Sequence, residues 1–286
     1  MTDEMRKFRT TVIVLLTIVL LWTAFLSIAL FYHSETEKIR RESENFGIYV
    51  CGTSVQYKNA ADVLGDGTVS YDPGGNMLML SNATLEYDGA AVIFAEKDLT
   101  IVLDGDNKLI CTGEGSVAGL YASDYMLRKD ISFIGGGTLT VEKGGNADTV
   151  VAGIVAKDIW AYSNITVDLT GVAEGSAGIE CGQLCLLGEN TVSVKVESTG
   201  AANGIFASGN VTLMDNTTLD VTNISAGENR IGMECTGSFM ACKGSAINAT
   251  AGDDGFGLLC HSVFFDYGAT VNCEIDAVGG LRHVTE

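Results

Sequence analysis

A short apolar phrase recurs along the chain at nearly constant spacing. It opens with glycine, continues with Ile, Leu or Met, and carries Ala or Cys three residues after the glycine. The opening residues are Gly119, Gly153, Gly178, Gly204, Gly232 and Gly257, with Val92 in the place of glycine in an earlier copy. The steps between them are 27, 34, 25, 26, 28 and 25 residues. A period of this length without helix caps indicates a solenoid, in which each repeat packs only on its neighbours.

The alternation within each phrase predicts which side chains face the core. The first and third residues after the glycine should point inward and the second outward, because side chains alternate along a strand. One inward column would then be Ile93, Leu120, Ile154, Ile179, Ile205, Met233 and Leu258, and the other Ala95, Ala122, Ala156, Cys181, Ala207, Cys235 and Cys260.

Each coil also carries a second alternating strand. These strands are expected at residues 99–103, 139–141, 165–169, 192–196, 219–222 and 271–275. Coils of about 25–28 residues with two or three short strands predict an all-β fold, the parallel β-helix. Leucine-rich repeats have a similar period but need a helical segment and a Leu/Asn pattern that this chain lacks.

The 34-residue step between Gly119 and Gly153 is the longest. It holds residues 124–137, which include Arg128 and Lys129. Insertions in solenoids leave the coil as loops and often mark the working face, although an ordinary longer turn explains the length as well.

The N-terminal region follows a different pattern. Residues 11–32 form an uncharged apolar run of 22, and roughly 20 suffice to cross a bilayer as a helix. A cleaved signal peptide is the alternative, because a small-x-small site ends at Ala29. The predicted organisation is a cytoplasmic tail (1–10), a transmembrane anchor (11–32), a charged stalk (33–46), an N-terminal β cap (47–76) and the parallel β-helix (77–286), which would face outward as a single-pass cell-surface domain.

Composition narrows the range of partners. The net charge of −19 argues against binding nucleic acid, whose phosphates need Lys and Arg. Of the eight cysteines, Cys181, Cys235 and Cys260 stand where other coils carry alanine, so they behave as small hydrophobic residues. Cys235 and Cys260 fall on adjacent coils, which leaves a disulfide between them open. A zinc site is not expected, since no C-x-x-C pair occurs and the three histidines are scattered.

Acidic turns are candidate calcium sites. Asp104, Asp106 and Asn107 offer oxygen ligands of the kind that calcium prefers, and Asp253 and Asp254 fall in a second turn. Asp, Gly and Asn are also the usual turn residues, so a structural role explains them equally well.

Exposed aromatic residues are candidate ligand-binding positions. Phe94, Tyr121 and Phe206 occupy the outward position of the phrase, and Trp160 and Tyr162 share one strand face. Flat rings at solenoid spacing suit stacking against sugar rings; the alternative is that they pack under a loop or a neighbouring domain. No G-x-S-x-G nucleophile motif occurs, and no motif supports Lys195, Arg128 or Lys129 as the base of a lyase.

Residues 64–87 (LGDGTVSYDPGGNMLMLSNATLEY) and 97–110 (KDLTIVLDGDNKLI) resemble the opening coils of carbohydrate-binding-domain-containing β-helix surface proteins of anaerobic Firmicutes, within the pectate-lyase-like class. The resemblance implies a right-handed parallel β-helix, an extracellular location, and polysaccharide binding that can use calcium. The chain is therefore expected to be a membrane-anchored module that binds polysaccharide or another surface ligand without catalysis. A pectate-lyase-like lyase or hydrolase, and a structural spacer or protein-binding adhesin, are the alternatives.

Overall fold

A computed structural model describes residues 3–124, 126–145, 149–227, 231–252, 255–277 and 281–283. The chain forms an all-β parallel β-solenoid of about seven turns, with one apolar helix at the N-terminus, which confirms the predicted fold class. Asp253 and Asp254, a predicted acidic turn, lie outside the described residues.

The N-terminal helix α1 spans Asp3–Glu42. Its segment Leu15–Glu35 has a mean hydropathy of 2.3 and is long and apolar enough to cross a membrane. The predicted tail, anchor and most of the stalk therefore belong to one continuous helix. This helix and the solenoid are separate compact units.

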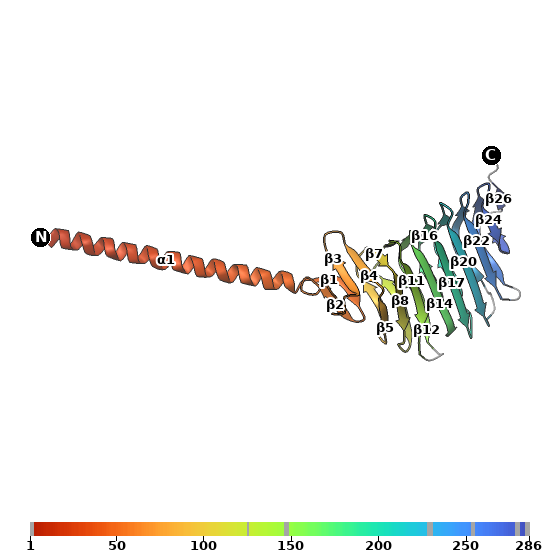
Figure 1. The fold of residues 1–286 in the computed structure, drawn as a ribbon, viewed down its shortest axis with the longest axis horizontal. Helices are drawn as coiled ribbons and strands as arrows, with labels where there is room; N and C mark the ends of the chain where they lie inside the picture. Colours follow the sequence, from red (N-terminus) through yellow and green to blue (C-terminus); the bar gives the residue numbers. More distant parts are fainter. Residues whose placement is uncertain are drawn as a thin grey trace. The chain divides into compact units, whose positions relative to one another are not determined.

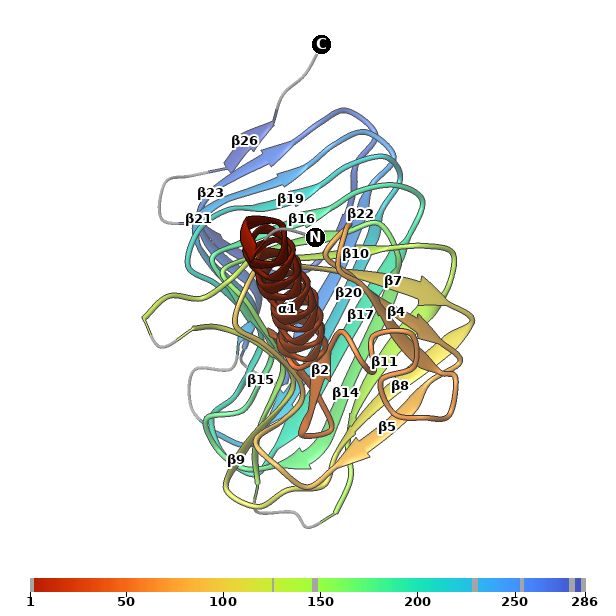
Figure 2. The same cartoon turned by 90° about the vertical axis from the view of Figure 1, so that its left-hand side faces the viewer.

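Each full coil of the solenoid contributes one strand to each of three faces (Figures 1 and 2). Face 1 consists of β4 (Met77–Ser81), β7 (Leu99–Asp104), β10 (Ile131–Ile134), β13 (Asp158–Ala161), β16 (Gln183–Leu186), β19 (Val211–Leu213), the second halves of β21 (Ile231–Ala241) and β23 (Phe256–Phe265), and β26 (Leu281–His283). Face 2 consists of β5 (Thr84–Tyr87), β8 (Asp106–Cys111), β11 (Thr138–Lys143), β14 (Asn164–Val172), β17 (Thr191–Ser198), β20 (Thr218–Ser225), β22 (Ala246–Ala251) and β24 (Thr270–Asn272). Face 3 consists of β6 (Ala91–Ala95), β9 (Ser116–Ala122), β12 (Val150–Val155), β15 (Ala177–Cys181), β18 (Asn203–Ala207), the first halves of β21 and β23, and β25 (Ile275–Ala277).

Strands of successive coils pair in parallel and in register, as Figure 1 shows for face 2. The predicted second strands divide between two faces, because residues 99–103 lie in β7 on face 1 whereas residues 139–141, 165–169, 192–196 and 219–222 lie on face 2. The predicted strand at 271–275 is wrong, because β24 ends at Asn272 on face 2 and β25 begins at Ile275 on face 3. Hydrophobic alternation alone could not separate these faces, since strands on either face present every second side chain to the same core.

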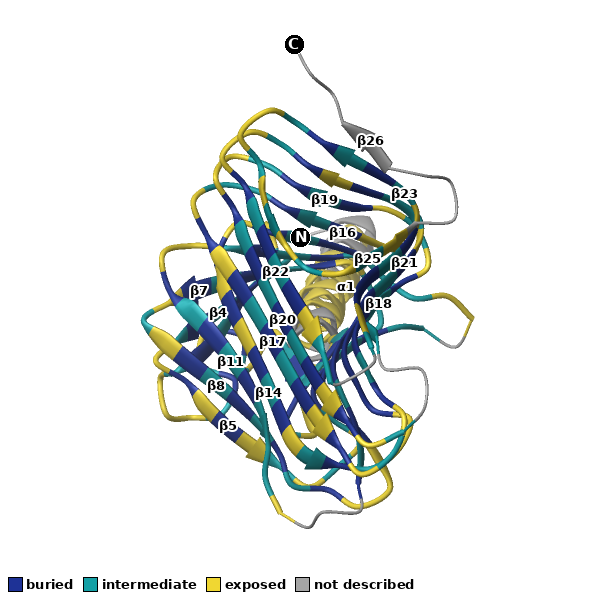
Figure 3. Cartoon of the chain, turned by 90° about the vertical axis from the view of Figure 1, so that its right-hand side faces the viewer, coloured by how far each residue is buried: buried dark blue, intermediate teal, exposed yellow. Residues whose placement is uncertain are grey.

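The core follows the predicted register. Both predicted inward columns are buried in every coil, and Ile154 and Ala156, for example, have no exposed surface. Figure 3 shows buried and exposed residues alternating along β14, β17 and β20, as expected for strands with one face on a core and one in solvent.

The N-terminal end of the solenoid is covered by antiparallel strands. β1 (Asn45–Val50) pairs with β6, and β3 (Val69–Asp72) pairs with β4. With β2 (Thr53–Gln56), these strands occupy the segment predicted to be the cap. Because an uncovered sheet edge exposes unpaired N–H and C=O groups, these strands protect the first coil from pairing with other chains.

Candidate functional site

The outward position of the repeated phrase forms one continuous column across face 3. Strand register places Tyr49 opposite Phe94, Phe94 opposite Tyr121, and Tyr121 opposite Val155. The column continues through Glu180, Phe206, Glu234 and Leu259. Neighbours in such a column are separated by the strand spacing of about 4.7–4.9 Å, so their side chains form a row that crosses the strands.

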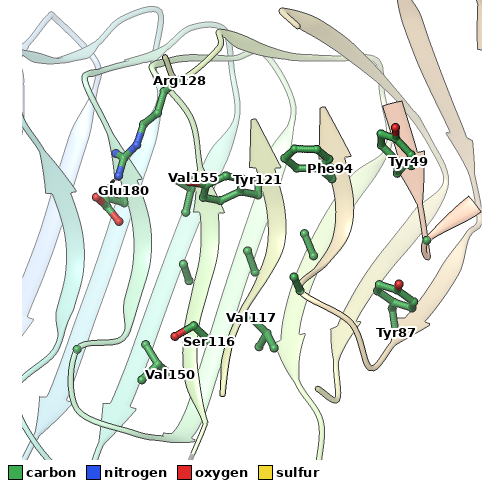
Figure 4. A pocket seen from close by; sticks show the side chains of 16 residues that line it. Tyr49, Tyr87, Phe94, Ser116, Val117, Tyr121, Arg128, Val150, Val155 and Glu180 are labelled. Atoms are coloured by element: carbon green, nitrogen blue, oxygen red, sulfur yellow. Dashed lines mark hydrogen bonds and ion pairs between the residues drawn. The ribbon is translucent and has the colours of Figure 1, made fainter. Parts of the chain in front are cut away.

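The first three members of this column are aromatic. The ring centroids of Tyr49 and Phe94 are 5.9 Å apart, and those of Phe94 and Tyr121 are 6.0 Å apart. The planes of Phe94 and Tyr121 lie within 19° of each other. Figure 4 shows the three rings following one another from coil to coil, so that three successive strands present a row of partly exposed aromatic surface.

This row borders a groove of about 700 Å³. Small residues from three coils, Ala91, Ala118 and Ala152, line its middle. Tyr87 and Ser116 lie on the side away from the row (Figure 4). A volume between about 300 and 1,000 Å³ with a mostly apolar lining and a few polar groups is typical of ligand sites.

The described residues of the long insertion form a short hairpin beside this groove. Ser123 and Arg128 make an antiparallel bridge, and the N–H of Lys129 donates to the carbonyl of Ala122. The guanidinium of Arg128 forms an ion pair with Glu180, two coils further on (Figure 4). The insertion thus supplies Arg128, one member of this charged pair, to the groove.

Asp124 stabilises the turn of this hairpin. Its carboxylate pairs with the ammonium of Lys129 and accepts the backbone N–H groups of Met126 and Leu127 at 2.8 and 2.7 Å. The hydrogen bond from Lys129 is the largest influence on its pKa, and together with the backbone N–H groups it lowers that pKa to about 2. The carboxylate therefore remains charged at every pH above that value.

Protonation of Asp124 should loosen the hairpin. Because the folded pKa is depressed, the contribution of Asp124 is present above its ordinary value of 3.8 and is lost as the pH falls towards about 2. Asp124→Asn, which removes the charge at neutral pH, is expected to speed amide hydrogen exchange at Met126 and Leu127 without changing exchange in β10. Unchanged exchange at both amides would contradict this role.

A second hollow of about 520 Å³ adjoins the groove and shares Gly175 and Glu180 with it. Phe206 lies here, between Glu180 and Glu234 in the outward column. The predicted aromatic column therefore changes character along the solenoid, from apolar in the first coils to alternating acidic and apolar residues in later ones.

The other predicted aromatic residues lie elsewhere. Trp160 lies on face 1, opposite Ser132 and Cys185, and Tyr162 directly follows β13 with 51% of its surface exposed. The structure therefore brings Phe94 and Tyr121 together in the groove and separates them from Phe206, Trp160 and Tyr162. The groove residues Tyr49, Tyr87, Ser116 and Glu180 were not among the residues predicted to bind ligand.

The predicted calcium turn is occupied by hydrogen bonds of the fold. The Asn107 side chain is buried, its Oδ1 accepts the N–H of Ala83 at 3.0 Å, and its Nδ2 donates to three carbonyl oxygens, including that of Thr138 at 3.2 Å. Asp106 accepts the Thr138 hydroxyl at 2.9 Å, and Asp104 accepts the Ser81 hydroxyl at 3.3 Å. Among the described residues, no group of three or more His, Cys, Asp or Glu side chains is placed to hold a metal ion.

The three basic residues considered for lyase chemistry all contact acidic groups. Arg128 pairs with Glu180, Lys129 with Asp124, and Lys195 lies 3.9 Å from Glu197. Lys195 also donates to the Thr170 hydroxyl at 3.1 Å. Each of these three cations therefore has a structural role on the solenoid surface, as the partner of a nearby carboxylate.

Comparisons of the chain with protein-family models, with curated proteins and with solved structures gave no match. The groove and its aromatic row are the features of this surface that can bind a ligand.

Proposed function

We propose that the solenoid binds a linear polysaccharide in the groove of face 3, without catalysis, and that α1 anchors it in the cell membrane with the solenoid outside. The observation that carries the proposal is the row of Tyr49, Phe94 and Tyr121 beside a lining of small alanines. Contiguous exposed apolar surface rimmed by polar residues is typical of interaction sites and ligand-binding grooves.

The shape of the groove favours an extended ligand over a compact one. Its lining residues come from the cap strand β1 and from successive coils, so a bound chain would cross the strands and meet one ring on each of three adjacent strands. The C–H face of a sugar ring can stack on an aromatic side chain, which offers both apolar area and a polarisable ring face. The alanine side chains end at Cβ, so the groove beside the aromatic row is deep enough to hold a sugar ring.

Polar groups at the edges can bind sugar hydroxyl groups. Tyr87, Ser116 and the ion-paired Arg128 and Glu180 all line the groove. The hydroxyl of Tyr49 already accepts an N–H from Asn45 at 2.8 Å, which leaves its own proton to donate. In ligand sites of this kind, a few hydrogen bonds from polar groups fix the orientation of the bound molecule.

A protein partner is the second candidate, and the insertion hairpin favours it. Met126 and Leu127 at the hairpin are 90% and 68% exposed. Exposed apolar side chains on an ordered hairpin can insert into a pocket of another protein. An adhesin of this kind would bind through the hairpin rather than through the aromatic row.

A binding screen separates these functions. The full chain in detergent micelles would be tested against immobilised neutral and acidic polysaccharides, with calcium and with a chelator, while released products are measured. Binding without products is the expected result. Products would support the lyase or hydrolase alternative, and loss of binding in chelator would support a calcium site such as the Asp104 turn. Absence of both binding and products would favour the adhesin, and crosslinking on cells should then recover a protein partner that is lost in Met126→Ala.

A further inference from the structure

The interior of face 3 holds two thiols in direct register. Cys235 on β21 and Cys260 on β23 are paired residues of adjacent parallel strands, and both are buried, with 1% and 3% of their surface exposed. Paired residues on neighbouring strands have Cα atoms about 4.7–4.9 Å apart, within the range of about 4.4–6.8 Å that a disulfide spans. Among the strand registers that the structure describes, no other two cysteines are paired in this way.

The backbone next to this pair can adjust. The register between β21 and β23 shifts between Cys235 and Ser238, so β21 carries an extra residue directly after the cysteine. In-register parallel strands hold Cβ atoms slightly further apart than a disulfide prefers, and a bulge at this position gives the chain freedom to close the difference.

The pair lies beneath a small surface hollow. This hollow of about 210 Å³ is lined by Cys235 and Cys260 together with Thr236 and His261. Because both cysteine side chains face the core, a disulfide-containing molecule reaches the sulfur atoms when this end of the solenoid opens locally.

We propose that Cys235 and Cys260 form a disulfide crosslink between two adjacent coils near the C-terminal end of the solenoid, made by exchange with an external disulfide. One thiolate attacks a sulfur of the external disulfide, forms a mixed disulfide and releases one thiol. The second cysteine then attacks the protein sulfur of the mixed disulfide and releases the other thiol. The two cysteine protons end on the two released thiols, and the two electrons reduce the external disulfide, so the exchange balances.

The environment of the two thiols supports an order for these steps. The Cys235 thiol donates a hydrogen bond to the carbonyl of Gly237 at 3.7 Å, and the interaction between the two adjacent thiols lowers the pKa of Cys260 and raises that of Cys235. Cys260 is therefore the first nucleophile, because the thiolate is the reactive form. Cys181 occupies the same inward column opposite Ala207, and burial raises its pKa to about 12, so it provides a matched unreactive thiol.

The crosslink would stabilise the end of the solenoid. The strands that follow it, β24 and β25, have only three residues each, so short ladders hold the C-terminal coil in place. A disulfide between residues 235 and 260 closes a loop of about 25 residues and constrains this end of the chain against unfolding.

The test uses the full chain in detergent, first reduced and then treated with oxidised glutathione. After denaturation in N-ethylmaleimide, proteolysis and mass spectrometry should show one peptide pair joined through Cys235 and Cys260 and lighter by two hydrogens. The melting temperature should rise by roughly 5–10 °C and return on reduction. Cys181→Ala should behave like the parent, whereas Cys235→Ala should lose the rise; alanine fits there because Ala95, Ala122, Ala156 and Ala207 fill this column in other coils.

Several outcomes would overturn the crosslink. Complete alkylation of both cysteines, a glutathione adduct on Cys260 that persists in the parent protein, or a bond between Cys260 and Cys273 would each contradict it. A rise in melting temperature that survives in Cys235→Ala would show that another pair is responsible. These readouts are independent of polysaccharide binding, so the groove proposal can fail while the crosslink stands.

Discussion

Replacing Tyr121 with alanine is expected to weaken polysaccharide binding by about tenfold or more. Tyr121 is the last ring of the aromatic row and lies nearest to the Arg128–Glu180 ion pair. A ligand that contacts both the aromatic row and the ion pair would therefore contact its ring. Stacking of a planar base on an aromatic side chain is worth roughly 1–3 kcal/mol, and about 1.4 kcal/mol corresponds to tenfold in affinity. Isothermal titration calorimetry with a polysaccharide identified in the screen would measure the loss.

Two variants make this result specific. Tyr121→Phe keeps the ring and should retain most of the affinity, which separates stacking from a hydrogen bond of the hydroxyl group. Trp160→Ala removes a half-buried outward aromatic side chain on face 1 and should leave the affinity unchanged. Equal losses in Tyr121→Ala and Trp160→Ala would move the binding surface away from the groove, and no loss in Tyr121→Ala would refute stacking at this position.

The predictable part of this fold is the part that repeats. The inward columns could be derived from the sequence because strand alternation has a period of two and every coil repeats the same choice of side. Ile179 and Cys181 are buried for the same reason as Ile154 and Ala156, so an error in one coil would contradict all the others. The agreement among many coils is therefore enough to predict from the sequence which side chains face the core.

The groove depends on features that do not repeat. Tyr49 joins the aromatic row because β1 pairs antiparallel with β6 at the covered end, and no periodic signal predicts that pairing. Glu180 becomes part of the groove because a side chain from the insertion reaches it across two coils. The outward column was predicted correctly. Which of its members border a groove depends on tertiary contacts with β1 and with the insertion, and the sequence pattern does not predict those contacts.

Asn107 illustrates a different limit. As a turn residue beside two aspartates it suggests a cation ligand, yet its side chain turns inward and satisfies backbone groups of three successive coils. Buried backbone polar groups need partners, and a solenoid corner creates the same need in each coil. Asn190 satisfies backbone carbonyls in the same way, with its Nδ2 donating to those of Ala161 at 2.9 Å and Leu187 at 3.2 Å.

Gly204→Ala is expected to destabilise the solenoid by about 3 kcal/mol, the upper end of the usual range for overpacking. A Cβ atom at this position would lie 2.3 Å from the carbonyl oxygen of Gly232 and 2.6 Å from Cγ1 of Val221. The first neighbour is backbone of the next coil and cannot rotate away, whereas a side chain could. The same close approach recurs in the column, since a Cβ at Gly178 would lie 2.5 Å from the carbonyl oxygen of Gly204.

Gly136→Ala is the matched control, because a Cβ there meets nothing within 4 Å. It should melt like the parent, while Gly204→Ala should melt roughly 6–12 °C lower in the same calorimetric scan. Similar melting of the two variants would mean that the recurring glycine is not required by close approach between coils.

The position of the clash predicts a second consequence. Repeats in a solenoid contact only their neighbours, so damage between Gly204 and Gly232 should weaken one interface and leave the coils before it intact. The groove is built from Tyr49 to Glu180, in the part of the chain that precedes this interface. Gly204→Ala should therefore unfold in two steps and still bind polysaccharide below the first step, and simultaneous loss of binding and of the C-terminal coils would show that the solenoid unfolds as a single cooperative unit.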